Sequence, residues 1–184
     1  MTGVAGRIWS CAAFTLLYVS LYHLSALVSG PQDTGGLASL FFLPAFVRLL
    51  GFLIIGFWII PALFFAAAFL SLTGAYDLGP GNSAELVVAA FTAVGAPFGV
   101  FVVSWIEGLK PSLVNLTPLR LLGLSIGCAA GNAAAHYVSF LALGLEPPAA
   151  NVFFTFFLGD LIGTWVIIYL IKIVLTVYGR SIRS

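Results

Sequence analysis

The chain has 184 residues, of which 61% are hydrophobic and only 7% are charged. Soluble domains carry about 25% charged residues, so this composition excludes an ordinary soluble domain and predicts an integral membrane protein. The net charge of +1 excludes the strongly basic surface typical of nucleic-acid-binding proteins. The length leaves room for about five or six membrane helices. We therefore expect a single transmembrane domain over residues 1–184, with no separate catalytic domain.

Six apolar runs follow one another along the sequence. They span residues 8–29, 37–48, 49–73, 84–106, 119–144 and 151–175. The segments between most of them are rich in Gly and Pro, which end helices and tolerate tight turns. The first run ends without a clear small-x-small cleavage pattern, so we interpret it as a retained helix. The pattern predicts an all-α, polytopic helical bundle with about six crossings.

The second run, Leu37 to Arg48, is too short for an ordinary membrane helix and contains Pro44. Its twelve residues would form a helix of about 18 Å, whereas the hydrocarbon core is about 30 Å thick. The run is therefore either re-entrant, or it crosses with help from an extended stretch at residues 31–36. The second crossing is expected to be short or broken.

The distribution of charges favours a crossing. If 37–48 crosses, all basic residues share the side of the N-terminus: Arg7, Arg48, Lys110, Arg120, Lys172, Arg180 and Arg183. Four acidic residues, Asp33, Asp77, Glu85 and Glu146, then lie on the other side. Basic residues concentrate in cytoplasmic loops. We therefore predict six crossings in a bacterial inner membrane, with both termini in the cytoplasm.

Small residues recur at every fourth position in the last two runs. The fifth run carries Gly123, Gly127 and Gly131, and the sixth carries Gly159 and Gly163. Such spacing places a smooth ridge on one helix face, along which two helices can pack closely. The ridges serve either packing within the bundle, which is the more common use, or the docking of a partner membrane protein.

Several polar residues fall inside the apolar runs, where they are expensive and usually face the bundle interior. Asp160, His136 and His23 are expected about 13, 12 and 9 Å from the outer ends of their helices. Asn132 lies one turn from His136 on the same face. Arg48 either reaches the level of Asp160 and pairs with it, or it extends to the inner headgroups.

These residues allow two interpretations. They are structural hydrogen-bonding groups between helices, or they bind a ligand or relay a proton. Cys11 and Cys128 are the only cysteines, and their separation is not a metal-binding pattern. The sequence contains no recognisable catalytic or nucleotide-binding motif. We therefore expect no enzymatic activity, no cofactor and no metal site.

Two stretches resemble a known family. Residues 41–70 contain Leu43, Pro44, Val47 and Arg48 in an LPxxVRLL pattern, and residues 156–173 contain Asp160 in a GDxxG pattern. Both are similar to bacterial membrane-associated sensor domains, and Asn132 fits that family's polar position in the preceding helix. The resemblance implies a sensor-like or scaffold protein that acts through a membrane partner. The chain is shorter than the family's usual eight-helix domain.

Two alternatives remain open at this point. Substrate-binding S-components of vitamin transporters also have six helices, dock through small-residue ridges and bind a small-molecule ligand from the outer half. A third class comprises accessory or assembly subunits of larger membrane complexes. In all three cases the expected partners are membrane lipid and a second membrane protein, and nucleic acid is not expected.

Overall fold

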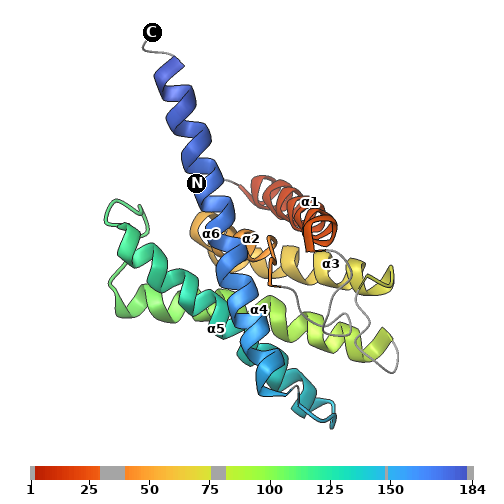
Figure 1. Ribbon diagram of the computed structural model, residues 1–184. Coiled ribbons are helices and arrows are strands. Elements are labelled where there is room, and N and C mark those ends of the chain that lie inside the picture. Colours follow the sequence, from red (N-terminus) through yellow and green to blue (C-terminus); the bar gives the residue numbers. More distant parts are fainter. Residues whose placement is uncertain (1–2, 30–39, 76–81, 148, 182–184) are drawn as a thin grey trace.

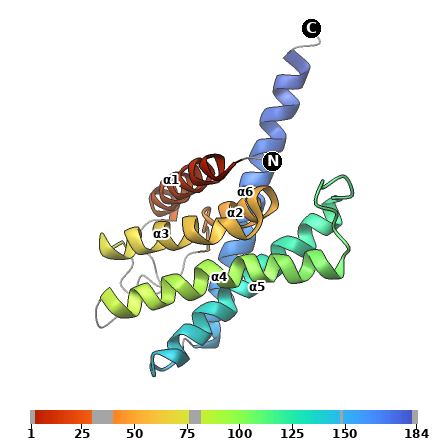
Figure 2. The same ribbon diagram turned by 180° about the vertical axis from the view of Figure 1, so that it is seen from behind.

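The computed structural model describes residues 3–29, 40–75, 82–147 and 149–181. These residues form helices α1 (Val4–Ser29), α2 (Ala45–Ile55), α3 (Ile59–Leu72), α4 (Asn82–Ile106), α5 (Pro118–Ala142) and α6 (Ala150–Ser181). A short 3₁₀ turn, η1 (Gly56–Trp58), joins α2 to α3. The protein is thus an all-α bundle of membrane helices, shown in Figure 1 and from behind in Figure 2.

Five stretches of the described chain are long and apolar enough to cross a membrane, and one of them, Ala45–Leu72, contains α2, η1 and α3 together. This stretch does not run straight. Gly56 adopts a φ of +61°, and a Cβ added at Gly51 would overlap the side chain of Ile59. In a straight helix, residues eight positions apart are separated by about 12 Å. The chain therefore folds back at η1, so that α2 and α3 run in opposite directions.

Helices α1 and α3 run in the same direction. The Cys11 thiol donates to the Trp58 carbonyl at 3.1 Å, the Thr15 hydroxyl to the Ala62 carbonyl at 3.1 Å, and the Tyr22 hydroxyl to the Ala75 carbonyl at 2.6 Å. Contacts therefore advance along both helices together. Because α1 and α3 are parallel, the chain between them has to return across the bundle, and α2 forms the helical part of that return.

The remaining helices alternate in direction. Phe57 lies against Phe101, which places the start of the α3 region beside the end of α4. Gly95 approaches Gly131 while Gly99 approaches Gly127, so α4 and α5 are antiparallel. His136 stacks on Phe156 near the start of α6. The start of α1 and the end of α6 consequently lie at the same end of the bundle.

The predicted second crossing is broken, but its boundary was placed wrongly. We expected separate runs at 37–48 and 49–73, whereas α2 continues through Arg48 to Ile55 and the chain turns at Gly56. Residues 40–44 are not helical. The crossing is therefore helical only in its second part. The proposed extended stretch at 31–36, together with Asp33, Asp77 and Arg183, lies outside the described residues.

The small-residue ridges pack within the bundle. An added Cβ at Gly99 would overlap the Gly127 carbonyl, and one at Gly131 would overlap the Gly95 carbonyl. Gly123 lies against the Glu107 side chain. The α4–α5 pair thus brings two backbones into near contact, as expected for small residues at a membrane helix interface.

Helix α6 is the longest, with 32 residues. It runs obliquely past the other helices, and its C-terminal part extends beyond them (Figures 1 and 2). Every residue from Tyr169 to Tyr178 is exposed, and most of them are apolar. This part of α6 is therefore covered by lipid or by another membrane protein.

Candidate functional site

A buried ion pair joins the broken crossing to α6. The Arg48 Nη1 donates to the Asp160 Oδ2 at 2.7 Å, and both side chains are nearly inaccessible, with relative exposures of 6% and 4%. Asp160 lies ten residues after the start of α6, which corresponds to about 15 Å along the helix. This depth is close to the middle of a hydrocarbon core of about 30 Å.

Aromatic side chains surround the Arg48 guanidinium. Its Nη2 donates to the Tyr18 hydroxyl of α1 at 2.8 Å. The guanidinium carbon lies 5.5 Å from the centre of the Tyr18 ring and 5.0 Å from the centre of the Phe42 ring. Cation–π contacts of this kind stabilise a cation that has lost its water. Helix α1, the segment just before α2, and α6 therefore hold Arg48 together.

The local sequence explains why α2 begins at this depth. Pro44 has no backbone N–H and suits the first turn of a helix. The backbone N–H of Leu43 donates to the buried Ser25 hydroxyl at 2.9 Å, so a side chain of α1 satisfies the backbone just before α2. The backbone of Phe42 lies directly on α6, where its N–H donates to the Gly159 carbonyl at 3.3 Å.

The two glycines of α6 allow this approach. An added Cβ at Gly163 would overlap the Phe42 carbonyl. Gly159 and Gly163 therefore accommodate a non-helical segment of the same chain, rather than another helix face. Among the described residues, all five glycines of the predicted ridges are thus placed against other parts of this chain, which leaves the partner-docking interpretation of the ridges without support.

Asn132 and His136 of α5 lie on the other side of Asp160. The Asn132 side chain is within hydrogen-bonding reach of the Asp160 carboxylate, and it is 1% exposed. The His136 ring stacks on the Phe156 ring with their centres 4.2 Å apart. Two buried atoms here, Asn132 Oδ1 and His136 Nδ1, have no hydrogen-bond partner in the described part of the chain.

His23 does not belong to this cluster. It is exposed on α1, where it packs edge-on against Tyr22. Its expected depth of about 9 Å is not contradicted, but its side chain lies on the exposed face of α1, because depth along a helix does not determine the face on which a side chain lies. Asp160, Arg48, Asn132 and His136 are brought together, and Tyr18 joins them.

Tyr18 was not among the residues predicted for the site. Its signal in the sequence was the spacing of Tyr18, Tyr22 and Ser25, which places three hydroxyl groups on one face of the first helix. All three are buried. Hydroxyl-bearing residues at helical spacing in an apolar run could therefore have identified the face of α1 that meets Arg48.

The cluster offers one carboxylate, one amide oxygen and one imidazole nitrogen beside a guanidinium. Across the described ranges, no three His, Cys, Asp or Glu side chains gather in a way that could hold a metal ion. A proton, or a monovalent cation held partly by neutral oxygens, is the ligand that a single carboxylate of this kind can accept. Such a ligand would share the Asp160 carboxylate with Arg48, whose Nη1 contacts its Oδ2.

Comparison with known proteins gives one informative similarity. The chain is 34% identical over 114 residues to the Na(+)/H(+) antiporter NhaA of Tolumonas auensis. The match covers 59% of this chain but only 27% of that protein, so the chain spans about a quarter of the relative's length. No protein-family model matches the sequence. A search of solved structures also found no match.

Proposed function

We propose that this protein takes part in cation-coupled membrane transport, with Asp160 binding a proton or a sodium ion in exchange for its contact with Arg48. The observation that carries the proposal is the buried Arg48–Asp160 pair at the start of a helix that begins inside the membrane. Buried charges at membrane depth are rare and commonly mark ion or proton pathways.

The broken crossing supports the proposal. Transporters commonly place their ion sites near the middle of the membrane, where interrupted helices supply exposed helix ends and non-helical backbone. Here residues 41 and 42 are non-helical, α2 starts at Ala45, and Arg48 lies in its first turns. A cation at Asp160 releases Arg48, so that α2 can shift about the turn at Gly56.

Buried acceptor atoms without a hydrogen-bond partner in the described part of the chain also support the proposal. A cation that replaces the guanidinium needs oxygen ligands to compensate for its lost water. Asn132 Oδ1 is such an acceptor, and it is buried beside Asp160 without another partner among the described residues. The partial similarity to a sodium/proton antiporter agrees with this ion chemistry.

Reconstituted vesicles test the proposal. The purified protein is placed in liposomes that contain a pH-sensitive dye, and Na⁺, Li⁺ or K⁺ is added outside. We expect a cation-dependent change of internal pH that is lost in the Asp160→Asn variant. The matched control is Glu146→Gln, because Glu146 is an exposed carboxylate in the connection between α5 and α6. A wild-type response equal to that of empty liposomes for all three cations would show the proposal to be wrong.

A second candidate function is that of a sensor-like module acting through a membrane partner. It is favoured by the part of α6 from Tyr169 to Tyr178, in which every residue is exposed. Purification from native membranes in mild detergent tests this candidate. A stoichiometric signalling protein would favour the sensor, whereas isolation of the protein without a signalling partner, together with cation-dependent pH changes in liposomes, would favour transport.

We place the protein in a bacterial inner membrane with both termini in the cytoplasm. The end of the bundle that carries Arg7, Lys110, Arg120 and Lys172 is then the cytoplasmic end, because basic residues concentrate there. A reporter fused to the C-terminus that is active only in the cytoplasm tests this orientation, and activity of a periplasmic reporter would reverse it.

A further inference from the structure

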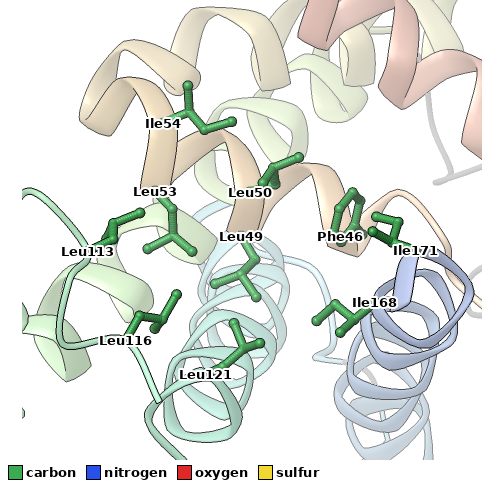
Figure 3. A pocket seen from close by; sticks show the side chains of 10 residues that line it. All are labelled: Phe46, Leu49, Leu50, Leu53, Ile54, Leu113, Leu116, Leu121, Ile168 and Ile171. Carbon is green, nitrogen blue, oxygen red and sulfur yellow. The ribbon is translucent and has the colours of Figure 1, made fainter. Parts of the chain in front are cut away.

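An apolar groove lies at the end of the bundle where α4 ends and α5 begins. Its volume is about 280 Å³, and ten residues line it: Phe46, Leu49, Leu50, Leu53, Ile54, Leu113, Leu116, Leu121, Ile168 and Ile171. All of them are aliphatic or aromatic. Figure 3 shows these side chains arranged around the space between α2, the α4–α5 connection, α5 and α6, with Leu49 and Leu53 pointing toward Leu116 and Leu121.

The α4–α5 connection is unusual for a loop. It places Leu113 and Leu116 in the groove wall, and its Val114 is 77% exposed. Leu113 adopts a φ of +56°, a conformation that costs energy for a residue other than glycine. A connection that exposes Val114 beside the polar residues Ser112 and Asn115 suits the membrane surface, and its Leu113 and Leu116 close one side of the groove.

Two basic residues are sequence neighbours of residues that line the groove. Lys172 follows the lining residue Ile171 and lies one helical turn beyond the lining residue Ile168, so it shares the face of Ile168, and its Nζ lies 5.9 Å from the centre of the Tyr169 ring. Arg120 directly precedes the lining residue Leu121, and its Nη1 donates to the Asn115 carbonyl at 2.9 Å. A groove with apolar walls and cationic edges is complementary to a molecule with an acyl chain and an anionic headgroup.

We propose that this groove binds an anionic phospholipid of the leaflet at this end of the bundle. One acyl chain occupies the groove beneath α2, and the phosphate lies between Lys172 and Arg120. Cationic side chains near the membrane surface attract anionic lipids, and the apolar walls of the groove favour burial of the acyl chain. Because α2 forms one wall and also carries Arg48, the bound lipid holds the broken crossing in place.

Native mass spectrometry tests the site. The full-length protein in detergent is mixed with equal amounts of phosphatidylglycerol and phosphatidylcholine of identical acyl chains. We expect phosphatidylglycerol to be retained at least about tenfold more strongly. The double variant Arg120→Gln/Lys172→Gln should bring the two lipids to similar retention. The matched control is Arg7→Gln, since Arg7 is a cation at the same end of the bundle, it stacks on Trp58, and neither of its sequence neighbours lines the groove.

A second variant distinguishes binding of the lipid's acyl chain from binding of its headgroup. Leu116→Trp fills the groove from the loop and should lower the retention of both lipids, while the elution profile in size-exclusion chromatography stays unchanged. A phosphatidylglycerol with a photoreactive group in its acyl chain should label peptides of α2 and α6. Equal retention of the two lipids by the wild-type protein, or labelling confined to the other end of the bundle, would overturn the proposal.

Discussion

Arg48 and Asp160 are 112 positions apart in the sequence, and their side chains meet at 2.7 Å in the interior of the bundle. The contact depends on the way in which the chain makes its second crossing. Residues 40–44 are not helical, and the backbone of Phe42 lies on α6 beside Gly159 and Gly163, where α6 has no side chains to exclude it. Helix α2 then starts at Ala45 and carries Arg48 to Asp160.

The hydroxyl group of Tyr18 is expected to contribute to the ion pair. In Tyr18→Phe the Arg48 Nη2 loses the hydroxyl acceptor of Tyr18, and a hydrogen bond to a charged group is worth about 1.5–3 kcal/mol. We expect a lower thermal stability in detergent, measured by the temperature at which the monodisperse peak is lost in size-exclusion chromatography. Tyr137→Phe is the control, because Tyr137 is exposed on α5. Equal effects of both changes would contradict the assigned role of the Tyr18 hydroxyl.

The close contact between α4 and α5 leads to a second prediction. Gly99→Ala places a methyl group against the Gly127 carbonyl, and overpacking of this kind costs about 1–3 kcal/mol. The variant should unfold at a lower temperature than the wild-type protein. Gly3→Ala is the matched control, since an added Cβ there meets nothing within 4 Å. A Gly99→Ala variant as stable as the control would show that the two backbones are not in contact.

The reversal at Gly56 leads to a prediction about sidedness. Single cysteines at Phe57 and Val114, both exposed, should react with a membrane-impermeant maleimide from the same side of the membrane. A cysteine at Ser83, near the start of α4, should react from the opposite side. The experiment uses a background in which Cys11 and Cys128 are replaced by alanine. In one straight crossing over Ala45–Leu72, residue 57 would lie about 18 Å along the helix, near the middle of the membrane, so failure of Phe57→Cys to react from either side would contradict the reversal at Gly56.

Much of the fold could be predicted from the sequence, because lipid imposes long apolar runs that are easy to recognise. The runs at 84–106 and 119–144 agree with α4 and α5 within a few residues. The turn at Gly56 was missed because a glycine within an apolar run looks the same whether it ends a helix or packs against one. Its positive φ is a property of the folded chain.

The site was predictable in part. Burial, charge and approximate depth indicated Asp160, Arg48, Asn132 and His136, since ionisable and amide side chains in apolar runs usually face the interior. His23 satisfied the same criterion of depth and yet lies on the surface of α1. Which face of each helix meets its neighbours depends on packing between helices, and a hydropathy pattern with apolar residues on every side contains little information about it.

The central claim is that Arg48 and Asp160 form one buried pair across the broken crossing, and a double-mutant cycle tests it most directly. Thermal stability is measured for Arg48→Met, Asp160→Leu and the double variant, all in the same detergent. Removal of one member of a buried ion pair costs roughly 3–5 kcal/mol, whereas replacing both by apolar residues is often nearly neutral. We expect both single variants to be strongly destabilised and the double variant to recover most of the loss. Additive losses in the double variant would contradict the pairing.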